Sequence, residues 1–123
     1  MDLKYEKAVE MCLNAETILE NVNKEKAKAD KAREKAYSIF EELGKANHAE
    51  SLVKQGWCFI YGIAQIGKNT NLTGADLTKS NLAKAGECFK KAVELGHNKA
   101  KKNLEDIKET KKLFEELKEA GVI

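Results

Sequence analysis

The sequence contains no proline, and aromatic residues make up only 7% of its 123 positions. Proline interrupts helices, so its absence leaves every segment free to continue a helix. Ala, Lys, Glu and Leu dominate instead, which is typical of helices whose outer faces meet water. The length suits one domain with a real core. These features predict a single all-α domain over residues 1–123.

An excess of one charge is also lacking, because 22 Lys and Arg residues face 20 Asp and Glu, a net charge of +2. This balance gives no global field that would favour nucleic acid or a membrane surface. The longest apolar run, GWCFIYGIAQIG, has about a dozen residues, whereas a membrane-spanning helix needs about 20. With no signal peptide visible, we expect a cytoplasmic protein with no membrane partner.

Cysteine and histidine are scarce. Cys12, Cys58 and Cys88 are odd in number, far apart and set in apolar contexts, which favours reduced core thiols over a disulfide framework. His48 and His97 stand at nearly equivalent turn positions, where we expect them to cap helices or stabilise turns. They lack the paired spacing of a Cys/His metal site, so no metal and no cofactor are predicted.

Apolar spacing predicts five helices, at about 4–22, 25–43, 47–65, 79–95 and 98–119. The second should stop at a left-handed Gly44, and Asn47 should be the N-cap of the third. Gly56 and Gly62 in the third helix are expected to pack closely against the alanine-rich second helix. The fifth carries one narrow apolar stripe and should cap the domain.

The stretch TNLTGADLTKSNLAKA, residues 70–85, repeats a small residue, Asn or Asp, and Leu in three pentads. It resembles pentapeptide-repeat solenoids, but a solenoid coil needs about four pentads and further coils stacked on it to bury its leucines. Residues 67–78 are therefore predicted to form a loop, with Asp76, Thr78 or Ser80 capping the fourth helix. A local solenoid-like turn is the alternative.

The segments AREKAYSIFEELGKANHAESL and AKAGECFKKAVELGHNKAKKNL, which begin at positions 32 and 83, echo each other. Aligning Gly44 with Gly96 places Tyr37 opposite Phe89 and separates the two units by about 52 residues. This alignment predicts a repeated helix, turn and helix start.

The second unit combines a small-x3-aromatic-x2-small pattern with a Gly-His turn. It resembles the second helix of a tetratricopeptide repeat, and its continuation resembles the Sel1-like variant. The residues that carry the resemblance are Ala85, Phe89 and Ala92, followed by Gly96, His97, Ala100 and Leu104. The resemblance implies about two helical hairpins plus a C-terminal capping helix, whose concave face binds a protein or peptide.

Trp57 and Tyr61 lie four positions apart on the predicted third helix. The first helix of each hairpin lines the concave surface in tetratricopeptide-like arrays, so the resemblance makes this pair candidate anchors for a peptide. Burial in the core is the alternative reading.

A basic ridge at helical spacing lies on the predicted second helix and consists of Lys24, Lys28, Lys31 and Lys35. We interpret it as a solvated face, with binding to an acidic peptide or a nucleic-acid backbone as the alternative.

No phosphate loop, HExxH motif, dinucleotide glycine pattern or nucleophile elbow is present in the sequence. We therefore predict a noncatalytic protein-protein interaction module and not an enzyme. The alternative is a small regulator or inhibitor that docks on nucleic acid, or on a nucleic-acid-processing enzyme, through the basic ridge. Whether the chain is a monomer or a homodimer stays open.

Overall fold

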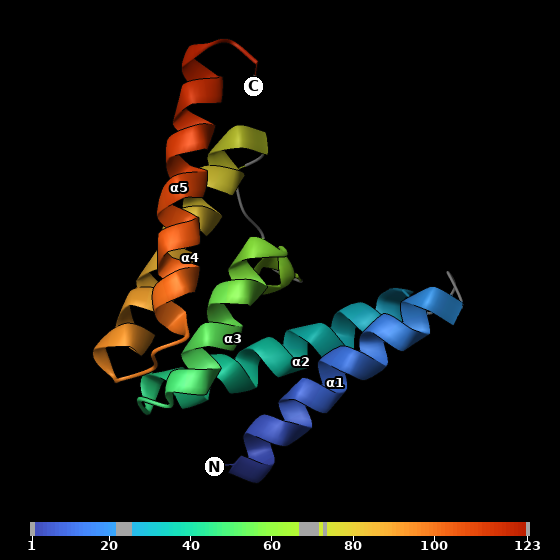
Figure 1. Ribbon diagram of the computed structural model, residues 1–123. Helices are drawn as coiled ribbons and strands as arrows, with labels where there is room; N and C mark the ends of the chain where they lie inside the picture. The colour runs from blue at the N-terminus through green and yellow to red at the C-terminus, as the bar shows by residue number, and fades with distance from the viewer. Residues whose placement is uncertain (1, 22–25, 67–71, 73, 123) are drawn as a thin grey trace.

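The computed structural model describes residues 2–21, 26–66, 72 and 74–122. All regular elements in these ranges are helical, which confirms the all-α class (Figure 1). They are α1 (Asp2–Asn21), α2 (Lys26–Lys45), α3 (Ala49–Ile60), the short 3-10 helix η2 (Ile63–Gln65), α4 (Gly74–Glu94) and α5 (Ala100–Glu119). No helix in the described part of the chain is long and apolar enough to cross a bilayer.

Each long helix packs against the next one in the chain. Figure 1 shows α1 beside α2 and α4 beside α5, with the shorter α3 between the two pairs. Two buried clusters correspond to these pairs, and α3 contributes to both. The first contains Ala8, Ala36, Tyr37, Phe40, Cys58 and Ala64, and the second contains Leu52, Val53, Leu82, Ala85, Phe89, Ala92, Ala100 and Ile107.

Small side chains dominate the buried positions of the first helix pair. Ala8 and Ala15 in α1, and Ala29 and Ala36 in α2, have no exposed surface. Alanine is the best helix former and adds little width to a helix, so two helices can approach closely without losing helical propensity. The closely packed pair is therefore α1 and α2.

The turns between α2 and α3 and between α4 and α5 have the same construction. Asn47 has φ 63°, and the following N–H donates to the Leu43 carbonyl oxygen at 3.0 Å. Gly96 has φ 91°, and the following N–H donates to the Ala92 carbonyl oxygen at 3.0 Å. A left-handed residue closed by this backbone hydrogen bond is the Schellman type of helix ending. Asn47 is therefore the structural counterpart of Gly96.

Two predictions about the first turn are wrong. Gly44 does not end α2, because the helix continues to Lys45 and Gly44 is buried inside it. A Cβ at position 44 would come within 2.9 Å of Gln55 Oε1 on α3, so this glycine serves close packing. Asn47 is not the N-cap of α3, since it takes the left-handed conformation and His48 is the N-cap.

The predicted alignment of the two units is wrong by three residues, because the left-handed residue of the first turn is Asn47 and not Gly44. Phe40 corresponds to Phe89, and both are almost completely buried, at 1% and 0% exposure. Tyr37 lies one helical turn earlier. The units are thus 49 residues apart, as the pairs Phe40/Phe89 and His48/His97 show.

The third helix is shorter than predicted. It ends at Ile60 with Tyr61 as the C-cap, and Gly62 (φ 75°) begins the 3-10 turn. The prediction that Gly62 packs closely against α2 is therefore wrong, because nothing lies within 4 Å of a Cβ placed there. Gly56 does sit at a close contact, but its neighbour is Phe89 of α4, whose Cε1 would be 2.6 Å from an added Cβ.

The fourth helix begins earlier than predicted. Gly74 (φ 55°) is its first residue, so part of the predicted loop 67–78 is helical. Asp76, Thr78 and Ser80 lie inside α4 and do not cap it; the Thr78 hydroxyl donates to the Gly74 carbonyl oxygen at 3.2 Å. The solenoid-like alternative is wrong for residues 74–85, while 67–71 and 73 lie outside the described residues.

A polar contact joins the end of the α3 region to α4. Asn81 is buried at 9% exposure, and its Oδ1 accepts a hydrogen bond of 2.7 Å from Gln65 Nε2. Asn81 belongs to the third pentad, whose leucine, Leu82, is buried in the second cluster. The third pentad is therefore part of α4, where Asn81 bonds to Gln65 after α3 and Leu82 packs in the second cluster.

Candidate functional site

Trp57 and Tyr61 form a stacked aromatic pair at the surface of α3. Their ring centroids are 5.7 Å apart with an interplanar angle of 19°. Tyr61 is 70% exposed and Trp57 is 36% exposed. The alternative, that both residues are buried in the core, is therefore wrong. Trp57 is also held from beneath by an edge-to-face contact with Phe89, with centroids 5.9 Å apart. The pair is exposed and yet fixed in position.

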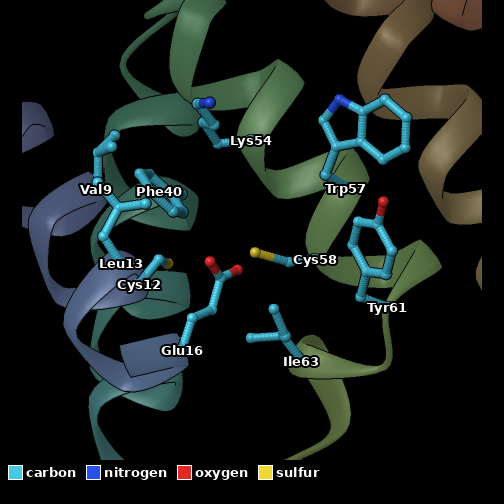
Figure 2. Close-up of a pocket in the computed structure, with 10 residues that line it drawn as sticks. All are labelled: Val9, Cys12, Leu13, Glu16, Phe40, Lys54, Trp57, Cys58, Tyr61 and Ile63. Atoms are coloured by element: carbon cyan, nitrogen blue, oxygen red, sulfur yellow. The ribbon is translucent and has the colours of Figure 1, made fainter. Parts of the chain in front are cut away.

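A hollow of about 240 Å³, here called the first hollow, lies beside this pair (Figure 2). Two stripes at i, i+3, i+4 and i+7 line it, one from α1 and one from α3, and each stripe is one face of its helix. The lining residues are Val9, Cys12, Leu13 and Glu16 of α1, Lys54, Trp57 and Cys58 of α3 with its C-cap Tyr61, together with Phe40 and Ile63.

The first hollow has apolar walls and charged ends. Figure 2 shows Leu13 on one side and the aromatic pair on the other, with Phe40 and Cys58 between them, Lys54 toward one end and Glu16 toward the other. Neither Lys54 nor Glu16 has an ion-pair partner among the residues that the structure describes. Both charges are therefore available to a molecule that enters from solvent.

A second hollow, of about 160 Å³, lies on the other side of Trp57. It is lined by Trp57 and Ile60 of α3, Leu82 and Phe89 of α4, and Asn103, Asp106, Ile107 and Thr110 of α5. The four α5 residues are the 49-residue counterparts of Lys54, Trp57, Cys58 and Tyr61 in the first hollow, and Phe89 is the counterpart of Phe40. The two hollows therefore occupy equivalent places in the internal repeat.

A polar trough extends the first hollow past Tyr61. This adjoining hollow, of about 560 Å³, shares Glu16, Tyr61 and Ile63 with the first one. Its other lining residues are Lys26, Asp30, Arg33, Gly62 and Ile66. The face presented by α1 and α3 is thus an elongated channel, apolar at Trp57 and charged beyond Tyr61.

The three cysteines are free thiols, of which Cys58 is buried and Cys12 and Cys88 are half-buried. Burial raises the pKa of Cys58 to about 12 and that of Cys88 to about 11, and desolvation also raises the pKa of Cys12. A thiol with a raised pKa is protonated near neutral pH and is a poor nucleophile. Among the described side chains, no three His, Cys, Asp or Glu residues gather closely enough to hold a metal ion.

Both histidines serve the turns, which confirms their predicted role. His48 Nδ1 accepts hydrogen bonds from the backbone N–H and the hydroxyl of Ser51, at 3.3 and 2.7 Å. His97 Nδ1 accepts from the Ala100 N–H at 3.1 Å. Since its Nδ1 is an acceptor, His97 donates through Nε2 to Glu50 Oε1, 2.6 Å away. The ring atoms are therefore engaged in holding α3 and α5 in place.

The basic ridge lies apart from the two hollows. Lys28, Lys31 and Lys35 are exposed on α2, and Lys24 lies outside the described residues. Lys31 and Lys35 share a shallow hollow with Glu34, whose carboxylate offsets their charge. Met11, Ser38 and Ile39 complete its lining. The ridge is thus a mixed surface and not a uniform basic one.

Three charged residues of the first and second hollows were missed by the sequence analysis: Glu16, Lys54 and Asp106. A signal for Lys54 was present, because Lys54, Trp57 and Tyr61 lie on one helical face. Asp106 gave no such signal, since it stands in a segment of mixed charge and becomes notable only where α5 meets Trp57.

No protein-family model matches this chain, and no curated protein or solved structure is significantly similar to it. The likeness to tetratricopeptide and Sel1-like repeats therefore rests on the residues of this sequence alone.

Proposed function

We propose that this protein is a noncatalytic protein-binding module of the tetratricopeptide/Sel1-like kind, which holds a segment of another protein on the face formed by α1, α3 and α5. The observation that carries the proposal is the fixed, exposed Trp57–Tyr61 pair standing beside two hollows. Tryptophan and tyrosine are enriched among residues that dominate binding energy, and a rigid pair loses little side-chain freedom on binding.

The size and shape of the channel support a polypeptide as the occupant. The first hollow has a volume of about 240 Å³ and is open to solvent beside the aromatic pair. It also continues into the polar trough beyond Tyr61, so the site is long and open at its side. Such a channel suits successive side chains of one segment, with an apolar residue near Trp57 and polar residues farther along.

The state of the cysteine thiols and of the His97 ring supports binding over catalysis. The Cys12 and Cys58 thiols in the first hollow have raised pKa values. The His97 ring is occupied on both nitrogens by Ala100 and Glu50. An activated nucleophile needs a lowered pKa or a free adjacent base, and these groups offer neither. We place the protein in the cytoplasm, where free thiols are stable.

The proposal is tested with the double variant Trp57→Ala/Tyr61→Ala and the control Leu95→Ala. Leu95 is 41% exposed and lines neither hollow, so its loss removes apolar surface elsewhere. Affinity capture from the native host, read by mass spectrometry, should yield a protein that wild type and the control retain and the double variant loses. Circular dichroism should show equal helicity in all three. Equal capture by all three proteins would contradict the proposal.

A further inference from the structure

We propose that the second hollow binds a lysine or arginine side chain of the partner segment, while the first hollow binds an apolar side chain of the same segment. This inference rests on the proposed function and specifies the partner's chemistry. Trp57 lines both hollows, so a segment lying across its indole reaches both.

The second hollow combines an apolar base with a polar rim. Its base consists of Ile60, Leu82, Phe89 and Ile107, and its rim on α5 carries Asn103, Asp106 and Thr110. Basic side chains lay their aliphatic stems on apolar surface and place the charged group where it can be solvated or paired. This hollow provides surface for the stem and a carboxylate for the cation.

Asp106 is the charged group that selects the cation. Its side chain is exposed on α5 and has no ion-pair partner within the described ranges. The hollow has a volume of about 160 Å³, which leaves room for a single side chain. A cation beside a carboxylate at a partly dry surface forms a charge-assisted hydrogen bond, which is stronger than a neutral one.

Trp57 adds a second attraction for a cation. An ammonium or guanidinium group within about 6 Å of an indole ring is attracted by its π electrons. Stacking on Tyr61 and contact with Phe89 fix the indole, so this wall of the second hollow is already in place before binding.

Comparison of the two hollows argues that they take different side chains. At equivalent positions, α3 carries Lys54 and Trp57 where α5 carries Asn103 and Asp106. In the first hollow Lys54 offsets the charge of Glu16 and the walls are apolar, whereas Asp106 gives the second hollow a net negative charge. The basic residue of a segment is thus directed to the second hollow and the apolar residue to the first.

The experiment selects ligands from a phage-displayed library of random dodecapeptides on the wild-type protein. The selected peptides should combine Lys or Arg with Leu, Ile, Met or Phe at one recurring spacing. Affinities of synthetic peptides can be measured by isothermal titration calorimetry, because the variant Trp57→Ala/Tyr61→Ala lacks the protein's single tryptophan and cannot be followed by its fluorescence. Asp106→Asn should weaken binding roughly tenfold to a hundredfold, the range for one charged hydrogen bond.

A double-mutant cycle separates the contact from general electrostatics. A peptide with norleucine at the basic position should lose affinity for wild type and lose nothing further on Asp106→Asn. Glu105→Gln is the matched control, because it removes the same charge from an adjacent exposed residue that does not line the hollow. It should leave the affinities unchanged.

The outcomes distinguish the two proposals. If no selected peptide prefers wild type to Trp57→Ala/Tyr61→Ala, the proposed function fails, and this inference fails with it. If peptides need the aromatic pair but carry no recurring basic residue, or bind Asp106→Asn equally well, this inference is wrong and the proposed function stands. Equal weakening by Glu105→Gln would also overturn the inference, because the general field of α5 would then explain the preference.

Discussion

The two repeated units share their buried parts and differ in what they present to solvent. Phe40 and Phe89 are buried at equivalent positions, and Asn47 and Gly96 close equivalent turns. The outward positions differ, since the aromatic Trp57 in one unit becomes the acidic Asp106 in the other. Inward residues are constrained by packing and backbone geometry, whereas outward residues are free to specify a partner.

The turns also differ in how firmly they are tied to the preceding unit. His97 Nε2 lies 2.6 Å from Glu50 Oε1, while His48 Nε2 lies 3.9 Å from Asp2 Oδ1. Asp2 stands in the first turn of α1 and Glu50 in the first turn of α3, so each histidine faces the start of an earlier helix at nearly equivalent positions. The second turn is therefore held by a short hydrogen bond and the first by a long electrostatic contact.

The largest expected effect comes from emptying the buried aromatic position of each unit. Phe40→Ala and Phe89→Ala should each lower the free energy of unfolding by about 3–5 kcal/mol, because a large buried side chain leaves a cavity. Phe89→Ala should also alter the fluorescence of Trp57, which rests on that ring. Urea unfolding followed by circular dichroism measures the loss. A loss below about 1 kcal/mol at either position would break the equivalence of the two units.

The next largest effect concerns a position that carries a titratable thiol in one unit and an aliphatic side chain in the other. Cys58 is the counterpart of Ile107, and burial raises the pKa of the Cys58 thiol from 9.0 to about 12. The folded state keeps this proton longer than the unfolded chain, so the stabilisation is complete below pH 9 and is lost as pH rises toward 12. The slope approaches about 1.4 kcal/mol per pH unit for one proton.

Cys58→Val should remove this part of the pH dependence, and Cys12→Ala should change it less. The raised pKa values of Tyr5 and Tyr37, both about 12, add a loss above pH 10 that these variants leave in place. Chemical unfolding at pH 8, 9.5 and 10.5 under reducing conditions measures the slopes. Identical slopes for wild type and Cys58→Val would contradict the assignment.

The smallest effect compares the two turn histidines. His48→Ala and His97→Ala each remove a side chain that accepts a backbone N–H at a helix start, for a loss of about 0.5–2 kcal/mol. His97→Ala should cost more, since it also breaks the hydrogen bond to Glu50. Glu50→Gln, which keeps an acceptor, should lie between wild type and His97→Ala. Thermal unfolding ranks the variants, and a larger loss for His48→Ala would reverse the comparison.

The sequence predicted the helices better than their ends. Alanine and leucine spacing located five helices, yet Gly44 misled the alignment because glycine is also used where a helix needs close packing. The Phe-x7-His spacing, present at Phe40/His48 and Phe89/His97, was the better signal. The alignment of Gly44 with Gly96 did not use it.

The sequence predicted part of the candidate site. Trp57 and Tyr61 were singled out, but their exposure was undecided, because an aromatic residue on a helix can face either a neighbouring helix or solvent. Gly56 was expected to face α2 and faces Phe89 of α4 instead. The apolar residues of a helix indicate that it is covered, but they do not indicate which neighbouring helices cover it.

The sequence by itself determined the all-helical class and the histidine turns, because these follow from contacts within a few residues of one another. The tertiary structure alone decided that α1 and α5 flank α3, that Trp57 lines two hollows and that Asp106 stands across from it. Such pairings join residues almost 50 positions apart, and local periodicity carries no information about them.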